Sequence, residues 1–358
     1  MIIDIHQHYL PERPNIPNEP RQDWLYADSR VQGYRDVGAL LTDMDDAGID
    51  QVVWQGEYFR SGDHCRERNR RVEAARSIAP HRLGAFASIQ PMSADAIDEI
   101  ARARENGFMG VGELNVNAQG FSLRDKAVQR VFAQCERWAL PVLLHVNEPV
   151  GPAYMGKVNN ALLSAYELAA RFPELRLIMA HWGGGLWWYE QIPEVQQILR
   201  NVWYDTAASF FTYPNTALMA QMAALVVPHK ILFGSDYPLR PPSVPHGWLR
   251  QWTTIMDQAC PEAYRSAWMG LNAAHLVAQQ RPSPHPRLEG DVAPMLTAKT
   301  PLVVVAERWP DRLPILAQWG IHCDDHTPWW QTIAHALSES GHGPDELSRL
   351  MQALREGL

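Results

Sequence analysis

The chain has 358 residues, of which 46% are hydrophobic and 20% are charged, so it can bury a large core and is not a disordered polypeptide. Its formal net charge of −8 gives no basic footprint, and we expect no nucleic-acid partner. No apolar run approaches the roughly 18 residues of a membrane span, and the N-terminus lacks the pattern of a secretory signal, so we expect no membrane partner and a cytoplasmic location. The four cysteines form no CxxC pair and fit reduced thiols.

Short apolar runs alternate with helical patterns from the N-terminus to about residue 280. Because strands that are separated by helices pair in parallel, eight such units predict an α/β fold, a closed (β/α)8 TIM barrel over residues 1–280. A doubly wound open sheet is the alternative, although the opening lacks a Gly-rich nucleotide loop. The predicted strands are 2–6, 51–54, 82–89, 109–114, 142–146, 177–180, 202–205 and 231–233, and the clearest helical patterns are 95–106, the segment after Asp125, 161–171, 215–225 and 263–279.

The last part of the chain has a different character. Residues 281–296 open with RPSPHPRLEG and are predicted to form a proline-rich linker. Residues 297–358 carry helical patterns at 303–319 and 328–358 and predict a small all-α domain. In this part Pro344, followed by Asp345 and Glu346, suits the first turn of a final helix.

The first predicted strand carries the sequence Asp4-Ile5-His6-Gln7-His8. Residues two apart on a strand project to the same side, so His6 and His8 can converge on one ion. Imidazole nitrogens are natural ligands for zinc and similar divalent ions. Taken alone, the pair also fits two polar residues at the end of a strand.

Three other strands end in an ionisable residue. The apolar runs before His145, His181 and Asp236 each stop at that side chain. In a parallel barrel the carboxyl ends of the strands meet at one face, where the active sites of such barrels lie. The shared polarity of these strand ends indicates one metal site rather than separate core histidines.

The motifs DIHQH, LLHVN, MAHWGGG and FGSDYP, with Gly270-Leu-Asn-Ala-Ala, resemble the amidohydrolase superfamily, and its amidohydrolase-2 branch most closely. That branch includes decarboxylases, lactone hydrolases and related metal enzymes, and the resemblance covers residues 1–280. It implies that His6, His8 and His145 bind a divalent metal ion, for which we expect zinc. It also implies that Asp236 ligates the ion or acts as a base, and that His181 polarises the substrate or steadies a bound water.

The number of ions depends on Glu113, near the end of the fourth predicted strand. This residue resembles the bridging glutamate of the superfamily's binuclear deoxyribonucleases, while no lysine occupies a comparable strand end. If Glu113 reaches the metal, the site holds two ions. If Glu113 is only an outer hydrogen-bond acceptor, the site holds one.

The loops after the strands are expected to contact a small-molecule substrate. Aromatic walls with an occasional arginine suit a cyclic or carboxylate-bearing compound. Arg240 is the candidate carboxylate clamp, and the other candidate substrate contacts are Glu148, Trp182 and Tyr237. Each of these aromatic side chains would equally serve to pack a loop.

Three functions fit this sequence. Hydrolysis of an amide, lactone or ester bond by a metal-activated water is the leading hypothesis. Non-oxidative decarboxylation of an unsaturated or aromatic acid, with Asp236 protonating the ring carbon, needs the same residues. A catalytically silent barrel that serves as scaffold for the C-terminal domain is the third.

The C-terminal segment around Trp309–Cys323 resembles a small helical domain often found beside redox or iron-repair proteins. It could have a protein partner, and His322, Cys323 and His326 could bind a metal, although a packed structural cysteine fits equally well. The sequence leaves open whether the chain forms a homo-oligomer.

Overall fold

The computed structural model describes residues 1–10, 36–151, 153–154, 156–239, 247–278, 296, 298, 300, 302, 305–306, 309–323 and 331–356. The chain divides into two compact units, Met1–Arg281 and Pro282–Leu358. Each unit is described by itself.

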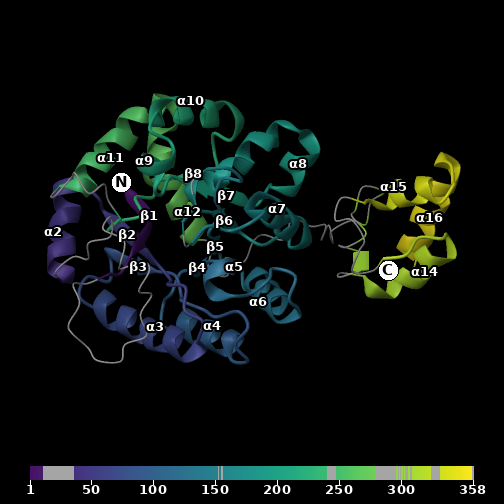
Figure 1. The fold of residues 1–358 in the computed structure, drawn as a ribbon, viewed down its shortest axis with the longest axis horizontal. Helices are drawn as coiled ribbons and strands as arrows, with labels where there is room; N and C mark the ends of the chain where they lie inside the picture. Colours follow the sequence, from purple (N-terminus) through teal and green to yellow (C-terminus); the bar gives the residue numbers. More distant parts are fainter. Residues whose placement is uncertain are drawn as a thin grey trace. The chain divides into compact units, whose positions relative to one another are not determined.

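The first unit is a parallel α/β barrel, as predicted (Figure 1). Its strands pair in parallel in the orders β1-β2-β3 and β4-β5-β6-β7-β8. The strands are β1 (Ile3–His8), β2 (Gln51–Gln55), β3 (Leu83–Ala85), β4 (Val111–Leu114), β5 (Val142–Leu144), β6 (Leu177–Met179), β7 (Val202–Asp205) and β8 (Ile231–Leu232).

Backbone hydrogen bonds just beyond the regular strands connect these two groups at both edges. The amide of His8 donates to the carbonyl of Tyr237 at 2.8 Å, and the amide of Asp236 donates to the carbonyl of His6 at 2.8 Å. On the other side, the amide of Ala87 donates to the carbonyl of Gly110 at 2.8 Å. These contacts join β1 to the segment after β8 and the segment after β3 to β4, so the barrel closes with little regular pairing at its two seams.

Helices surround the strands (Figure 1), and the longer ones bury one apolar side. In α6, Val128, Val131, Phe132 and Cys135 are buried at the spacing of one helical face, as the sequence predicts. The elements of this layer are α2 (Val37–Ala47), α3 (Gly62–Arg76), α4 (Ala96–Glu105), α5 (Val116–Gln119), α6 (Lys126–Arg137), α7 (Ala161–Arg171), η1 (His181–Gln191), α8 (Pro193–Ile198), α9 (Ser209–Thr212), α10 (Thr216–Val226), α11 (Trp248–Ala259), η2 (Glu262–Tyr264), η3 (Ala267–Leu271) and α12 (Asn272–Ala278).

The second unit is helical, with a core of its own. Its described elements are η4 (Pro310–Arg312), α14 (Leu313–Gln318), α15 (Ile333–Glu339) and α16 (Pro344–Glu356). Pro344 begins α16, with Asp345 and Glu346 in its first turn, as predicted. Buried apolar side chains, among them Leu316, Leu337 and Leu350, form the core, against which the partly buried Cys323 packs. Except for Leu296, the predicted linker 281–296 lies outside the described residues, as does His326.

Among the described residues, none of the helices is both long enough and apolar enough to cross a membrane. The three cysteines of the barrel are buried, and no disulfide joins any of the four.

Candidate metal centre

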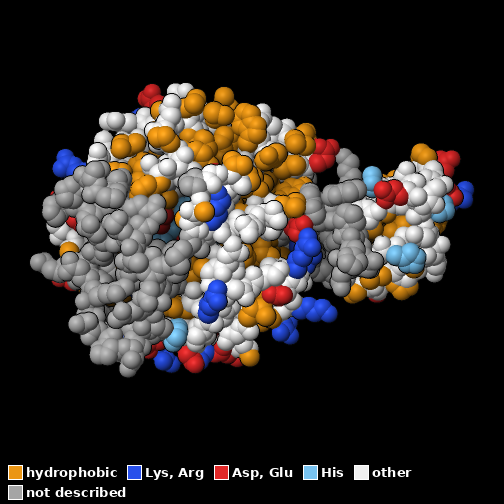
Figure 2. Space-filling view, in the orientation of Figure 1, with side chains coloured by type: hydrophobic (Ala, Val, Ile, Leu, Met, Phe, Trp, Pro, Cys, Tyr) orange, Lys and Arg blue, Asp and Glu red, His pale blue; other side chains and the backbone are white. Residues whose placement is uncertain are grey.

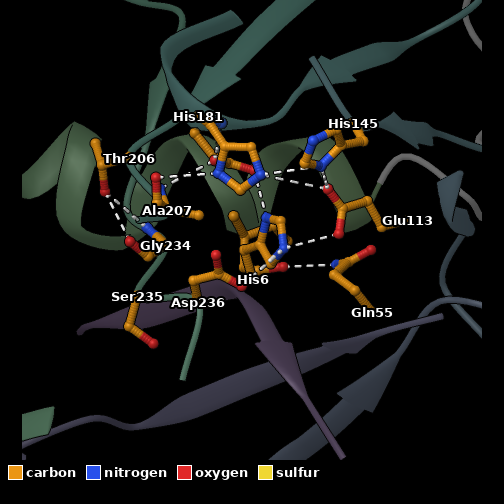
Figure 3. A network of polar contacts seen from close by, with 12 residues as sticks. His6, Gln55, Glu113, His145, His181, Thr206, Ala207, Gly234, Ser235 and Asp236 are labelled. Carbon is orange, nitrogen blue, oxygen red and sulfur yellow. Dashed lines mark hydrogen bonds and ion pairs between the residues drawn. The ribbon is translucent and has the colours of Figure 1, made fainter. Parts of the chain in front are cut away.

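Histidine and carboxylate side chains converge at the carboxyl ends of six barrel strands (Figure 3). All of them are buried, so their charges and lone pairs face one another rather than water. They are His6 and His8 on β1, Glu113 on β4, His145 after β5, His181 after β6, Asp205 on β7 and Asp236 after β8.

In one part of this cluster, His6 and His8 both lie near one oxygen of Glu113 and near one oxygen of Asp236. The Nε2 atom of His6 lies 3.4 Å from Glu113 Oε2 and 3.6 Å from Asp236 Oδ1. The Nε2 atom of His8 lies 3.7 Å from the same glutamate oxygen and 3.2 Å from Asp236 Oδ1. The two imidazole nitrogens and the Glu113 oxygen are close enough together to hold one ion, and Asp236 lies beside both histidines.

The other part gathers two histidines around the second oxygen of Glu113. His145 Nδ1 lies 2.8 Å and His181 Nε2 lies 3.5 Å from Glu113 Oε1. The two imidazole nitrogens are 3.2 Å apart. Figure 3 shows the Glu113 carboxylate between His145 and His6, with one oxygen toward each. The structure thus places His145 with His181 rather than with His6 and His8.

These spacings fit metal ions. Ligand atoms about 2.0–2.1 Å from a tetrahedral zinc ion lie about 3.3–3.4 Å from one another. The separations in the first group, from 3.2 to 3.7 Å, fall near that value. In the second group the separations of 3.2 and 3.5 Å do so, while the 2.8 Å between His145 Nδ1 and Glu113 Oε1 is a hydrogen-bond distance. Among the described residues, His6 Nε2 is fully buried and has no hydrogen-bond partner, which is expected of a nitrogen that serves as a metal ligand.

The opposite nitrogens of three histidines are already engaged. His6 Nδ1 lies 2.8 Å from Asp205 Oδ2, and His181 Nδ1 lies 3.2 Å from the carbonyl oxygen of Ala207. His145 Nε2 lies 3.1 Å from the hydroxyl of Tyr154. Outer partners of this kind fix the tautomer of a ligating histidine and turn its free nitrogen toward the metal.

The buried carboxylates of the cluster give its centre a negative charge that bound cations would balance. Burial raises the pKa of Glu113, but the surrounding histidines outweigh it and hold that pKa well below its ordinary value. The same competition lowers the pKa of Asp236 to about 2, with His8 the strongest of its partners. Among the described residues, Glu113, Asp205 and Asp236 form ion pairs only with histidines, so divalent cations would supply charge that no described lysine or arginine provides.

The backbone at His181 is shaped by the Gly-rich sequence that follows it. His181, Trp182 and the glycines 183–185 all have φ between +55° and +91°, the left-handed region that favours glycine. A Cβ on Gly183 would lie 2.6 Å from the ring of Tyr204, and one on Gly184 would strike the carbonyl of Asn147. The left-handed backbone together with these close contacts requires glycine at positions 183 and 184.

Three of the four predicted substrate contacts lie among the described residues, and each of the three has a hydrogen-bond partner within the protein. Trp182 is fully buried, and its indole nitrogen donates to Ser209 Oγ at 2.6 Å. The hydroxyl of Tyr237 donates to Asp43 Oδ2 at 2.7 Å, and Glu148 is half-buried and hydrogen-bonded to Tyr213. Arg240 lies outside the described residues. Their roles toward a substrate stay predictions.

Three residues of the cluster are missing from the sequence-based set. Asp205 carried a readable signal, because it too ends an apolar strand run. Tyr58, whose hydroxyl donates to Glu113 Oε2 at 2.5 Å, and Tyr154 lie in loops without a periodic pattern. Only the folded barrel brings these two tyrosines to the site.

Comparisons with solved structures show the same fold in enzymes of known or assigned activity. The chain is 18% identical to 2,6-dihydroxybenzoate decarboxylase from Rhizobium, with a TM-score of 0.58, over 78% of this chain and 98% of that one. It is 19% identical to a dihydroxybenzoic acid decarboxylase from Polaromonas sp. JS666 that holds manganese and 2-nitroresorcinol, with a TM-score of 0.56, over 78% and 97% of the two chains.

A probable 2-pyrone-4,6-dicarboxylic acid hydrolase from Acinetobacter baumannii, crystallised with citric acid, is 16% identical, with a TM-score of 0.53 over 77% of this chain and 99% of that one. Comparison with curated proteins gives no match. The family model described as amidohydrolase matches residues 3–278, which is most of the chain and nearly all of the barrel. This chain is therefore a member of the amidohydrolase family.

Proposed function

We propose that the barrel is a metal-dependent hydrolase that uses two divalent ions, with Glu113 bridging them. One observation carries the proposal: the two oxygens of Glu113 face different groups of ligand atoms, each close enough together to hold an ion. A carboxylate that only accepts a hydrogen bond from one ligating histidine would be expected beside that histidine, whereas Glu113 lies between four imidazoles. The two-ion form of the site is thus favoured over the one-ion form.

The first ion would take His6 Nε2, His8 Nε2, Asp236 and one oxygen of Glu113. The second would take His145 Nδ1, His181 Nε2 and the other oxygen. Sites rich in imidazole suit zinc, with other transition ions as competitors. The second ion would have fewer ligands from the protein and therefore open positions for water or substrate.

Bound divalent ions supply acidity, because they lower the pKa of a coordinated water and polarise a carbonyl or phosphoryl oxygen. The residues of this chain supply position and proton transfer. Asp236, whose pKa is held at about 2, is ionised at neutral pH and can accept a proton from the attacking water and return it to the leaving group. Tyr154 is 41% exposed and its hydroxyl lies 3.1 Å from His145 Nε2, so it is a candidate to contact a substrate that enters from the solvent side.

Decarboxylation of a hydroxylated aromatic acid is the second candidate. It is supported by solved structures of the same fold that are decarboxylases of 2,6-dihydroxybenzoate, 5-carboxyvanillate and dihydroxybenzoic acid, at 18%, 15% and 19% identity to this chain. In that case Asp236 would protonate the ring carbon. A small-molecule substrate and a cytoplasmic location stay predictions for both candidates.

Metal content tests the proposal. Elemental analysis of the purified full chain should give about two equivalents of a transition metal, and His145→Ala should lose about one while the His6 group keeps its ion. Glu194→Gln, a change at an exposed position on α8, serves as the matched control and should keep both. One equivalent in the wild type that is unaffected by His145→Ala would overturn the two-ion site.

Turnover separates the candidate reactions. A panel of lactones, esters and amides should be hydrolysed by the metal-loaded enzyme and not by Asp236→Ala. Release of carbon dioxide from hydroxybenzoates, with no hydrolysis in the panel, would establish the second candidate instead. A fully loaded protein that acts on neither class would leave the scaffold hypothesis.

A further inference from the structure

The segment that follows β2 is packed tightly against β4, and this packing brings Tyr58 to the metal centre. The amide of Gly56 donates to the carbonyl of Gly112, the residue before Glu113. A Cβ on Gly56 would lie 2.7 Å from that carbonyl oxygen, which is closer than a side chain can come. The approach of the two segments therefore depends on glycine at position 56, and it sets Tyr58 beside Glu113.

Hydrogen bonds from neighbouring loops fix the backbone on both sides of Tyr58. The amide of Glu57 donates to Ser88 Oγ at 2.9 Å. The carbonyl of Phe59 accepts a hydrogen bond from Gln119 Nε2 at 3.3 Å. The fold of three loops, after β2, β3 and β4, thus sets the position of the Tyr58 ring.

The hydroxyl of Tyr58 contacts one proposed ligand of each ion. It donates to Glu113 Oε2 at 2.5 Å and lies 3.4 Å from His145 Nδ1. Figure 2 shows acidic side chains on the surface of the barrel, where water can hydrate them, whereas Glu113 is 1% exposed and Tyr58 is 8% exposed. A hydrogen bond from a hydroxyl to a carboxylate is charge-assisted, and breaking it in a buried site is costly.

We propose that Tyr58 is a positioning residue that keeps Glu113 in its bridging mode, with one oxygen on each ion. This inference rests on the proposed two-ion site. A carboxylate can bind a metal ion through one oxygen or through both. If Glu113 turned so that both of its oxygens faced the first ion, the bond from Tyr58 to Oε2 would break. The hydroxyl therefore opposes that turn.

The second ion depends most on this restraint. Besides Glu113, the first ion would keep His6, His8 and Asp236, whereas the second would keep only the two histidines of its own group. A Glu113 that turned toward the first ion would add an oxygen there and remove one from the second. Tyr58 is thus expected to control the affinity of the second ion, although its hydrogen bond is to the oxygen assigned to the first.

Two other roles fit Tyr58 less well. A substrate contact is better served by Tyr154, which is exposed beside His145 while Tyr58 is buried. A tyrosine that only stabilises the core is exemplified by Tyr204, whose hydroxyl donates to Glu190 Oε1 at 2.6 Å. That carboxylate belongs to an ion pair with a lysine rather than to the metal centre, so Tyr204 is a matched control.

Titration of the metal-free full chain with Mn²⁺, followed by electron paramagnetic resonance, tests the proposal. The wild type should bind two ions whose spectra show spin coupling. Tyr58→Phe removes one oxygen and keeps the ring, and it should raise the Kd of the second ion about 10–100-fold, as expected for loss of an outer hydrogen bond. The Kd of the first ion should stay within a few-fold, and the coupled spectrum should appear only at higher Mn²⁺ concentration.

Tyr204→Phe loses a hydrogen bond of the same kind and should keep both Kd values and the coupled spectrum. Two coupled ions with unchanged Kd values in Tyr58→Phe would overturn the positioning role and leave the two-ion site standing. An equal rise of both Kd values, or the same rise in Tyr204→Phe, would assign Tyr58 to general stability instead. A wild type that binds a single ion would remove the two-ion site and this role with it.

Discussion

At the scale of single residues, Asp205 determines which nitrogen His6 turns toward the cluster. Its Oδ2 lies 2.8 Å from His6 Nδ1, while its Oδ1 accepts the backbone amide of His181 at 2.9 Å and that of Ala207 at 3.0 Å. One buried carboxylate therefore orients a proposed ligand of each ion, the first through its ring and the second through its main chain.

Replacing Asp205 by Asn should weaken metal binding by about 10–100-fold, because the amide is a poorer acceptor for the imidazole N–H and no longer raises its basicity. Competition with a chromophoric chelator measures this affinity. The exposed change Glu194→Gln should leave it unaltered. Equal affinities in Asp205→Asn and the wild type would mean that the contact with His6 is structural only.

Glu99 gives a stability prediction away from the site. Burial raises its pKa, but Arg102, which donates two hydrogen bonds of 2.8 Å, and Asn69, at 2.7 Å, outweigh burial and lower the pKa below 4.5. The stabilisation from a depressed carboxyl pKa is present above the pKa of the unfolded chain and is lost as pH falls through the pKa of the folded one.

Glu99→Gln should therefore reduce the free energy of unfolding by about 2 kcal/mol at pH 7, the value of a charge-assisted hydrogen bond, and by progressively less below about pH 4.5. Urea unfolding across this pH range measures the difference. Glu105→Gln, on the exposed side of the same helix, should have little effect at any pH. A pH-independent loss in Glu99→Gln would show that packing rather than charge is responsible.

At the scale of elements, the sequence predicts the strands well because each is a short apolar run, and several of these runs end in one ionisable residue. The run 202–205 matches β7, and β1 begins one residue later than expected and extends to His8. The run 82–89 pairs regularly only at Leu83–Ala85, since the residues beyond it lie at the seam before β4, where a single bridge joins Ala87 to Val111.

The ligand grouping could not be predicted in the same way. The strand ends show which side chains lie at the carboxyl-end face of the barrel. Which of these side chains contact one another depends on the distances between strands on opposite sides of the barrel. Glu113 lies on β4 and reaches His6 on β1, and this approach leaves no mark in the local pattern. The η1 segment reads as a loop because its glycines break helical periodicity.

Gly184 tests the importance of the η1 backbone. Gly184→Ala should lower the stability of the barrel by more than about 2 kcal/mol, because it combines a left-handed residue with a clash against the carbonyl of Asn147. Gly185→Ala is the matched control, since its φ is +91° but nothing lies within 4 Å of the added Cβ.

Thermal unfolding and metal content should be measured for both variants. Gly185→Ala reports the cost of a left-handed alanine alone, and the additional loss in Gly184→Ala reports the clash with Asn147. Gly184→Ala should also lose the ion that His181 is proposed to hold, while Gly185→Ala keeps it. Identical losses of stability in the two variants would remove the role assigned to close packing at Gly184.

At the scale of the whole molecule, every residue of the cluster belongs to the first unit, Met1–Arg281. The C-terminal unit has a separate apolar core. Its resemblance to a domain found beside redox or iron-repair proteins stays a prediction.

A chain that ends at Arg281 should therefore bind the same number of metal ions as the full protein, with affinities within a few-fold. Elemental analysis and chelator competition on both forms make the comparison. Loss of an ion on truncation would mean that the second unit completes the site. Circular dichroism of the shorter chain must first show a folded barrel.

A metal ion at this centre would also help to hold the barrel closed at one of its seams. Only a few main-chain bonds tie β1 to the segment after β8, yet the proposed first ion would take His6 and His8 from one side of that seam and Asp236 from the other. The ion would then link β1 to the segment that follows β8. Ligand present at about 100 times its Kd stabilises a fold by about 2.7 kcal/mol, so chelation should lower the Tm by several degrees, and hydrogen exchange should rise first at the amides of His8 and Asp236, where the ring would begin to open.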